Sequence, residues 1–524
     1  MSSVKVLDCT LRDGGYINDW KFGHNNIHEI ISELEKANID IIETGFLRPV
    51  EYEKDSSVFN TVEQIKEQIS PKKPGILYAV MIENRYYAKL SLPVYDGSSV
   101  DIIRVTFKKN EWQDAKNTIS DIVAKGYKVC VQPVGSATYD DQSLLNLIKD
   151  VNEIKPYAFY IVDTLGIMYR HDIRKFFYLI DNNLSMDICL GYHSHNNLQM
   201  AFANAQEMTR LVRNRTIILD SSCYGMGRGV GNLSTELIID YINNNIEHNY
   251  SMIPILNIVD KYLMPIYAEQ RWGYDLPYFL SATVKCHPNY AAHLIKKETL
   301  SIEKIEKLLS LIPIADRCEY NSELIEKLYI KMQSFNVDDD SSYAKLADVV
   351  SDQEVLVLGP GSSIVSYEEI IKNKADGSIV ISTNFIPANY KIDALFISNE
   401  KRLGTVDVHC IEHVIATSNL KNELPNAILF NYSSLLGEGD SSDNAGAMLI
   451  RILKKARVKK LLLAGFDGFD IDSSMNYAVS PFKKSLDYNV VKKKNEDISK
   501  QLKLALSGVE YEVITPTKYE IGNI

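Results

Sequence analysis

The sequence has few of the residues on which several classes of protein depend. Its 524 residues include only seven cysteines, with no Cys-x-x-Cys pair, which argues against a disulfide framework and favours reduced thiols. No stretch approaches the roughly 20 consecutive apolar residues of a membrane-spanning helix. The first ten residues, MSSVKVLDCT, lack the apolar run of a signal peptide. We therefore expect a cytoplasmic protein without a membrane span.

Positive charge is also in short supply. The 57 Lys and Arg residues stand against 68 Asp and Glu residues, and the formal net charge is −11. No broad basic face is therefore expected, which excludes nucleic acid and anionic membrane surfaces as expected partners. The remaining composition, 45% hydrophobic and 24% charged, is typical of globular proteins. The length predicts two or three domains.

What the sequence does contain is a regular alternation of apolar and amphipathic segments over its first half. Eight short runs are rich in Val, Ile, Tyr and Phe, as strands are, and most are apolar at nearly every position, which suits strands buried on both faces. These runs span residues 4–8, 39–46, 75–82, 100–107, 127–134, 157–166, 187–193 and 216–222. The pattern predicts an α/β fold, specifically a closed (β/α)8 TIM barrel, although an open doubly wound sheet remains an alternative.

The second half of the chain predicts two further parts. The amphipathic segment SIEKIEKLLSLI (301–312) indicates a helix with Ser301 as its N-cap. The acidic stretch NVDDDSSYAK (336–345) is interpreted as a linker, after which strand-like runs resume and predict an open parallel sheet. The expected domains are a metal-dependent barrel over 1–250, a helical extension over 251–345 and a Rossmann-like α/β domain over 353–524.

Two of the ten histidines lie close together in GYHSHNN, at the end of the seventh run. Side chains at i and i+2 of a strand point the same way, so His193 and His195 can face one point at the mouth of a barrel. Asp13, after the first strand, can supply an anionic oxygen, and Asn232, after the eighth, a neutral one. This donor set suits Mn²⁺, Mg²⁺ or Zn²⁺ acting as a Lewis acid. The alternative is one histidine in the core and one at the surface.

Three motifs support a more specific interpretation. DCTLRDGG (8–15), GYHSHNN (191–197) and GMGRGVGNLSTE (225–236) fall in order on the first, seventh and eighth predicted strands. Together they resemble the DRE-TIM metallolyase superfamily, the HMGL-like proteins that include the pyruvate carboxyltransferase domain. Among them the chain is nearest to the 4-hydroxy-2-oxovalerate aldolase-like proteins. The resemblance covers roughly residues 1 to 245.

The resemblance implies roles for particular residues. It implies that Asp13, His193 and His195 hold a divalent metal, with Asn232 as a fourth ligand, and that Arg12 binds the oxygen of an enolate. The chemistry is reasonable, because a metal ion and a guanidinium placed on an enolate oxygen stabilise the charge that develops there.

One position departs from the family pattern. Tyr16 stands where the aldolases usually have histidine and the Claisen-type synthases have glutamine. An unperturbed tyrosine, with a pKa of about 10, is a poor base at neutral pH. Another group can then take the proton, and His24, Glu43 and His287 are the alternatives. Arg12 has a structural alternative as well, namely a salt bridge to Glu43. The expected catalytic residues are Arg12, Tyr16 and Glu43.

Substrate contacts are expected from further strand ends, where such barrels perform their chemistry. The segment YDLPYFLSATVKCHPNYAAHL (274–294) can also fold over the barrel mouth as a lid, or it can form a helix–helix turn in the interface of a homodimer. The substrate-binding candidates are Arg104, Asp163, Thr164, His287 and Tyr290.

The third expected domain opens with VLVLGPGSSI (355–364), a strand, a glycine turn and the start of a helix. Backbone N–H groups at such a helix start favour phosphate. With the ISTNF segment (381–385), this order resembles sialyltransferase-like and motility-accessory-factor-like Rossmann domains, and it implies a nucleotide-sugar site. The alternative is a related fold used only for assembly. The implied nucleotide-binding residues are Gly359, Gly361, Ser362 and Asn384.

Three functional hypotheses follow. The leading one is a divalent-metal-dependent carbon–carbon lyase or aldolase that acts on a 2-oxo acid through pyruvate enolate chemistry, with an aldehyde as the second substrate and a role in surface-polysaccharide metabolism. The first alternative is a Claisen-type condensation of an acyl-CoA with a 2-oxo acid. The second alternative is a glycosyltransferase-like activity in the C-terminal domain.

Overall fold

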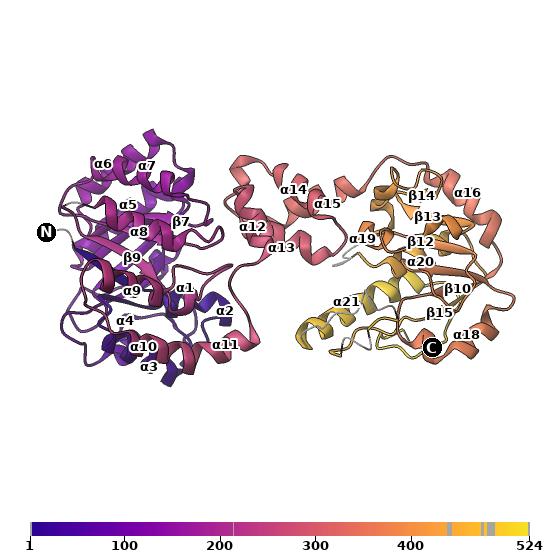
Figure 1. Ribbon diagram of the computed structural model, residues 1–524, viewed down its shortest axis with the longest axis horizontal. Coiled ribbons are helices and arrows are strands. Elements are labelled where there is room, and N and C mark those ends of the chain that lie inside the picture. Colours follow the sequence, from indigo (N-terminus) through magenta and orange to yellow (C-terminus); the bar gives the residue numbers. More distant parts are fainter. Residues whose placement is uncertain (1–2, 213, 438–442, 473–475, 479–487, 522–524) are drawn as a thin grey trace. The chain divides into compact units, whose positions relative to one another are not determined.

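The computed structural model describes residues 3–212, 214–437, 443–472, 476–478 and 488–521. The chain forms two compact units (Figure 1). The first unit contains Met1–Asn289 and Ile314–Tyr320, and the second contains Tyr290–Pro313 and Asn321–Ile524. No described helix combines the length and the apolar character that crossing a bilayer requires.

The first unit is built on a closed barrel of parallel strands. Strand β1 pairs with β9 on one side and with β2 on the other, which closes the ring. The barrel strands are β1 Val4–Asp8, β2 Ile41–Leu47, β4 Leu77–Glu83, β5 Ile102–Phe107, β6 Lys128–Pro133, β7 Ala158–Asp163, β8 Cys189–Ser194 and β9 Ile217–Ser221. Each corresponds to one of the eight predicted runs, so the closed barrel is confirmed over the open sheet. A short strand, β3 (Val58–Phe59), was not predicted.

Amphipathic helices surround the barrel. The apolar residues of α3 recur at helical spacing, with Ile27, Ile30, Ile31 and Leu34 all buried against the sheet. In α4, Thr61 and Gln64 form a capping box that fixes where the helix begins. The surrounding helices are α3 His24–Lys36, α4 Val62–Ile69, α5 Trp112–Ala124, α6 Asp141–Ile154, α7 Arg170–Asp181, α8 Ala201–Leu211 and α9 Thr235–Asn245.

Two very short helices follow β1 and carry the DCTLRDGG motif. They are α1 (Thr10–Asp13) and α2 (Gly15–Asn18). A Cβ atom on Gly14 would lie 2.3 Å from the carbonyl oxygen of Thr10, and one on Gly15 would lie 2.0 Å from the ring of Trp20. The glycine pair is therefore required for the tight turn that brings Arg12 and Asp13 to the barrel mouth.

Further helices of the first unit follow β9. They are α10 Met252–Ile258, a π-helical turn Val259–Leu263, α11 Met264–Glu269 and α12 Leu276–Thr283. Helix α10 packs against α3 and α9. Ala282 of α12 packs on Leu165 and Ile167, which lie in the loop after β7. Helix α12 therefore packs on a loop at the carboxyl-terminal end of the barrel, and the lid and the dimer-interface alternatives for residues 274–294 both stay predictions.

The second unit contains a seven-stranded parallel sheet in the order β14-β13-β12-β11-β10-β15-β16. The strands are β10 Glu354–Leu358, β11 Ile379–Thr383, β12 Ala394–Ile397, β13 His413–Thr417, β14 Ile428–Phe430, β15 Lys460–Ala464 and β16 Tyr511–Val513. The arrangement confirms an α/β fold with a parallel sheet in this half of the chain.

The helices of the later part of the chain include the predicted helix over residues 301–312, in which Ser301 accepts a hydrogen bond from the N–H of Lys304 at 3.4 Å. The expected linker over residues 336–345 is mostly helix instead. These helices are α13 Pro288–Lys297, α14 Ile302–Ser310, α15 Ser322–Gln333, α16 Asp339–Val350, α17 Ser363–Ser366, α18 Glu368–Ala375, α19 Glu400–Leu403, α20 Ala445–Lys455 and α21 Tyr488–Leu506.

Candidate metal centre

Three buried side chains meet at the carboxyl-terminal end of the barrel. Asp13 comes from α1, His193 from β8, and His195 from the residue after that strand's end. One potential ligand atom from each lies within 4.8 Å of the other two. Metal–ligand bonds of roughly 2.0–2.2 Å separate ligand atoms by about 3 to 4 Å, so a small adjustment of these side chains would bring all three onto one cation.

The hydrogen bonds of His193 orient its ring toward Asp13. Its Nδ1 atom lies 3.0 Å from Oδ2 of Asp220, and its Nε2 atom lies 3.3 Å from Oδ2 of Asp13. A carboxylate behind a ligating histidine commonly fixes the tautomer that presents the other nitrogen to a metal. Burial disfavours the charged ring, but the hydrogen bonds to Asp13 and Asp220 outweigh it and raise the pKa of His193. The position between Nε2 and Asp13 therefore favours a positive charge.

Two neighbouring polar atoms are buried without a partner among the described residues. They are Nδ1 of His195 and Oδ1 of Asn232, and the two residues face one another in an isolated β-bridge. Burial lowers the pKa of His195 to about 3, so its ring is neutral. A divalent cation would use unprotonated imidazole nitrogen and amide oxygen as ligands. These residues therefore fit the metal that the sequence predicted.

The glycine-rich loop after β9 approaches these groups closely. The backbone N–H of Arg228 donates to Oδ1 of Asp13 at 3.3 Å. A Cβ atom on Gly227 would lie 2.3 Å from Nδ2 of Asn232 and 3.1 Å from Oδ1 of Asp13. A glycine is therefore needed at position 227 for the loop to lie against the acidic ligand.

Arg12 connects the metal cluster to Glu43. Its Nε donates to Oε2 of Glu43 at 2.9 Å and its Nη1 donates to Oδ2 of Asp13. Burial acts against the charge of Asp13, but Arg12 and then His193 hold the pKa of Asp13 well below its usual range. The Nη2 atom of Arg12 is buried and has no partner within the described chain. The salt-bridge alternative is thus observed, and one donor is still available for a ligand.

Arg104 lies deeper in the barrel than the sequence suggested for a substrate contact. It is completely buried, donates to Oε2 of Glu43 at 2.7 Å and contacts Asp220. Its guanidinium carbon lies 5.0 Å from the centre of the Tyr160 ring. Arg104 is therefore placed to hold carboxylates in position. The buried side chains that form a closed ring of ion pairs are Arg12, Glu43, Arg104, Asp220, His193 and Asp13.

Asp163 and Thr164 have local backbone partners. The carboxylate of Asp163 accepts hydrogen bonds from the N–H groups of Ile167 and Met168, both at 3.0 Å, and burial raises its pKa to about 6. The hydroxyl of Thr164 accepts from the N–H of Gly135 at 2.9 Å. Both side chains thus stabilise the loops at this end of the barrel.

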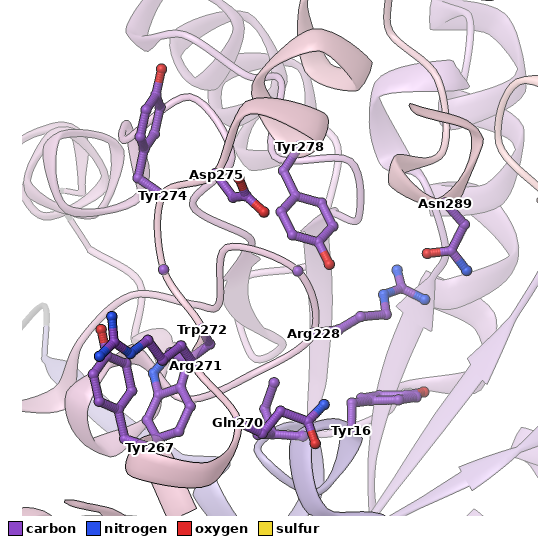
Figure 2. Close-up of a pocket in the computed structure, with 13 residues that line it drawn as sticks. Tyr16, Arg228, Tyr267, Gln270, Arg271, Trp272, Tyr274, Asp275, Tyr278 and Asn289 are labelled. Carbon is purple, nitrogen blue, oxygen red and sulfur yellow. The ribbon is translucent and has the colours of Figure 1, made fainter. Parts of the chain in front are cut away.

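Tyr16 lies at the rim of a cavity beside the metal cluster. The cavity encloses about 600 Å³, and its described lining residues all belong to the first unit. The Tyr16 side chain is 36% exposed, its ring packs edge-on against Trp20, and the guanidinium carbon of Arg228 lies 5.6 Å from its centre. Figure 2 shows Tyr16 and Arg228 together in this cavity.

The two histidines considered as bases occupy different environments. His24 begins α3, and its Nδ1 lies 2.8 Å from the amide nitrogen of Gln68 on α4, so it belongs to the outer helices. His287 is buried, and its ring Nδ1 accepts a hydrogen bond from the backbone N–H of Asn289. The backbone N–H of His287 donates to the carbonyl of Arg317. Burial lowers the pKa of His287 to about 3, which makes it a weak base.

The glycine turn of the second unit contains an internal carboxylate. Oδ2 of Asp467 accepts from the N–H of Ser363 at 2.7 Å and from the hydroxyl of Ser362 at 3.5 Å. A Cβ atom on Gly361 would lie 2.4 Å from the Asp467 carboxyl carbon, and one on Gly359 would lie 2.5 Å from a backbone oxygen. The carboxylate therefore takes a donor that a phosphate would use, and the nucleotide-sugar site stays a prediction.

Asn384 and Tyr290 also have partners within the second unit. Oδ1 of Asn384 accepts from the N–H of Ser398 at 3.0 Å, which ties β11 to the end of β12. Tyr290 is buried, and its hydroxyl accepts from the N–H of Asn321 at 3.1 Å. The structure thus gives both side chains local roles, and their predicted ligand contacts remain predictions.

The sequence interpretation assigned no role to Asp220 or to the side chain of Arg228. A signal for Asp220 was present, because TIILDSS places a carboxylate at the end of the strand next to the two histidines. In the sequence, nothing distinguishes Arg228 from the other residues of its glycine-rich loop. Its position depends on how that loop folds, which the sequence pattern does not predict.

The fold and these side chains define a (β/α)8 barrel with a carboxylate–histidine cluster able to hold a metal ion. Residues 3–260 match the HMGL-like family model. An oxaloacetate decarboxylase of Mycobacterium tuberculosis is 26% identical over 236 residues, which cover 45% of this chain and 68% of that protein. A 4-hydroxy-2-oxovalerate aldolase of Geobacillus genomosp. 3 is 21% identical over 272 residues, covering 50% and 78%.

Solved structures also resemble the chain. The HMG-CoA lyase of Brucella melitensis aligns with a TM-score of 0.39 and 15% identity, covering 49% of this chain and 96% of that one. The pairing of β1 with both β2 and β9 defines the barrel.

Proposed function

We propose that this protein is a divalent-metal-dependent carbon–carbon lyase that cleaves a 2-oxo acid. The observation that carries the proposal is the buried cluster of Asp13, His193 and His195 with the unpartnered Nη2 atom of Arg12 nearby. The match of residues 3–260 to the HMGL-like family model and relatives named as an aldolase and a decarboxylase of 2-oxo acids support it.

Asp13, His193, His195 and Asn232 are the residues that would hold the cation. Two imidazoles, one carboxylate and one amide oxygen form a mixed set that Mn²⁺, Mg²⁺ or Zn²⁺ can accept. When bound, the cation supplies Lewis-acid polarisation of the substrate's 2-oxo group. Asp220 fixes the ring of His193 from behind, and Glu43 fixes the guanidinium of Arg12.

Arg12 is proposed to stabilise the charge that cleavage creates. Breaking the bond between C3 and C4 sends its electron pair into the 2-oxo group and produces an enolate. The Nη2 atom of Arg12 would donate a hydrogen bond to the enolate oxygen, in a buried site where such a bond is strong. Protonation at C3 then gives pyruvate or its homologue.

The fate of C4 separates two versions of the reaction. If C4 is a carboxylate, it leaves as carbon dioxide and no base is required. If C4 carries a hydroxyl group, it leaves as an aldehyde after a base removes the hydroxyl proton. The cavity of about 600 Å³ that Tyr16 and Arg228 line favours a leaving group larger than carbon dioxide, so we favour aldol cleavage. The half-exposed hydroxyl of Tyr16 would accept the substrate's proton while it gives its own proton to solvent, so that the phenol stays neutral.

The test measures pyruvate release by the full-length protein from 4-hydroxy-2-oxo acids and from oxaloacetate, with Mn²⁺ or Mg²⁺ and after chelation. Chelation is expected to lower turnover at least 100-fold because it removes the cation. His193→Ala and His195→Ala are expected to lower it at least 100-fold because each removes an imidazole ligand. Tyr16→Phe is expected to lower the ratio of aldol cleavage to decarboxylation at least tenfold, because only the aldol step needs a proton passed from the substrate hydroxyl to solvent. The matched control is His171→Ala, since the His171 side chain is 78% exposed on α7.

Two outcomes contradict the proposal. One is pyruvate release that persists in the metal-free protein. The other is release of free CoA from an acyl-CoA and a 2-oxo acid without any cleavage of 4-hydroxy-2-oxo acids, which would support the Claisen-type alternative.

A further inference from the structure

The cavity beside the metal cluster is larger than a three-carbon 2-oxo acid requires. At about 600 Å³ it falls in the range of sites that bind whole small-molecule ligands, roughly 300–1,000 Å³. Arg228 joins it to the cluster, because its side chain lines the cavity and its backbone N–H donates to Asp13. A substrate bound at the cluster could therefore extend past Arg228 into this space.

Arg228 brings a positive charge that no described side chain neutralises. Within the described ranges, no carboxylate oxygen lies within 4.0 Å of its guanidinium, and its one described side-chain contact is the face of Tyr16. The side chain is half-buried. A guanidinium presents a planar fork of N–H donors that matches a carboxylate or a phosphate.

Two further polar groups point toward the same place. Figure 2 shows the hydroxyl of Tyr278 and the side-chain amide of Asn289 beside the guanidinium of Arg228. Neither of these two side chains has a hydrogen-bond partner in the part of the chain that the structure describes. Tyr278 comes from α12 and Asn289 from the start of α13, so three separate segments supply three available polar groups.

The negative charge in the cavity wall is already partly engaged. Asp275 lines the cavity, but its Oδ1 accepts from the N–H of Leu276 and caps α12. The second cation of the wall, Arg271, lies beside Trp272 and Tyr267 and apart from Arg228 in Figure 2. The Arg228 group is therefore the part of the cavity best suited to an anion.

We propose that Arg228, Tyr278 and Asn289 bind an anionic group, a carboxylate or a phosphate, on the aldehyde-derived half of the substrate. This proposal rests on the lyase function proposed above and deepens it. The 2-oxo end lies at the Asp13 and histidine cluster, and the far end carries the negative charge to Arg228. The substrate class is thus a 4-hydroxy-2-oxo acid with a second anionic group.

The test uses the Mn²⁺-loaded, full-length protein and aldol addition of pyruvate to three aldehydes. Succinic semialdehyde carries a carboxylate, glyceraldehyde 3-phosphate carries a phosphate, and propanal is neutral. The wild-type protein is expected to prefer one anionic aldehyde to propanal. Arg228→Gln is expected to lower that preference 10- to 100-fold, as expected for losing hydrogen bonds to a charged group, and Arg228→Lys is expected to restore part of it. Arg271→Gln, the matched control, is expected to change it less than twofold.

A binding measurement separates failure of the subsite from failure of the proposed function. Titration calorimetry with inorganic phosphate and with succinate does not require turnover, and Arg228→Gln is expected to weaken the binding of one of them at least tenfold. If the protein cleaves 2-oxo acids but Arg228→Gln changes neither the aldehyde preference nor anion binding, the subsite is refuted and the lyase function stands. If no 2-oxo acid is cleaved but anion binding still depends on Arg228, the lyase function is refuted and the anion subsite is supported.

Discussion

At the scale of single residues, the centre depends on carboxylates that serve more than one partner. Oε2 of Glu43 accepts from both Arg12 and Arg104, and Oδ2 of Asp220 contacts both Arg104 and His193. A change in one member therefore alters the position of at least two others. Buried charges of this kind are stable only when each keeps its partner.

Asp220→Asn is expected to weaken metal binding about 10- to 100-fold, because the carboxylate that orients His193 loses its charge. Titration of the purified variant with Mn²⁺ gives the affinity directly. Asp163→Asn is the matched control, since Asp163 is also a buried carboxylate at a strand end but uses both oxygens on backbone N–H groups. Equal Mn²⁺ affinities of the two variants would contradict an orienting role for Asp220.

The positions of single side chains could be predicted best where the geometry of the strands alone determines them. Alternation along β8 was enough to bring His193 and His195 to one side, and the closing order of the barrel brought Asp13 to them. The Rossmann-domain resemblance did not anticipate Asp467 in the glycine turn. A spacing of glycines indicates a tight turn, but it does not show which distant side chain enters that turn.

At the scale of elements, β7 and β8 depend on a residue without a side chain. Gly191 is the cross-strand partner of Tyr160, and a Cβ atom on Gly191 would lie 2.3 Å from the Tyr160 ring. The same ring lies over Arg104. The glycine therefore makes room for an aromatic ring inside the barrel, and that ring contacts the ion-pair network beneath the metal cluster.

Gly191→Ala is expected to destabilise the barrel by about 1–3 kcal/mol, because the Tyr160 ring must move within a packed interior. The urea midpoint of the tryptophan fluorescence transition measures the effect. Gly404→Ala is the control, because a Cβ atom there would meet nothing closer than 3.9 Å and the backbone φ of −65° is ordinary for alanine. A Gly191→Ala midpoint equal to that of the wild type would contradict this, because it would show that the Tyr160 ring can move aside without a loss of stability.

Among elements, the acidic stretch before the second sheet shows why composition can mislead. Asp338 accepts from the N–H of Ser341 and caps α16, while Asp339 and Asp340 lie in its first turn. Acidic residues at a helix start satisfy unpaired N–H groups and interact favourably with the helix dipole. Polarity suggested a linker here, whereas the order of these residues is typical of a helix N-terminus.

At the scale of the whole molecule, the chain provides a natural probe for one unit. Its three tryptophans are Trp20, Trp112 and Trp272, and all three belong to the first unit. Tryptophan fluorescence therefore follows the barrel unit, while circular dichroism follows both units. The two signals can show whether a ligand stabilises the unit that contains the metal cluster.

Adding Mn²⁺ at about 100 times its Kd is expected to stabilise the barrel unit by about 2.7 kcal/mol, because the ion binds the folded unit alone. The fluorescence transition should then move to higher urea, and His193→Ala should abolish the shift. A shift confined to the circular-dichroism signal, with unchanged fluorescence, would place the ion in the second unit.

The path of the chain has a consequence for how this protein can be divided. After Asn289 the chain contributes Tyr290–Pro313 to the second unit, and then Ile314–Tyr320 returns to the first. Within that returning stretch, the Arg317 carbonyl accepts from the N–H of His287, and its guanidinium donates to the carbonyl of Val284. The barrel unit is thus discontinuous in the gene, and no single crossover point could exchange its partner unit for another without also removing or duplicating part of the support beneath α12.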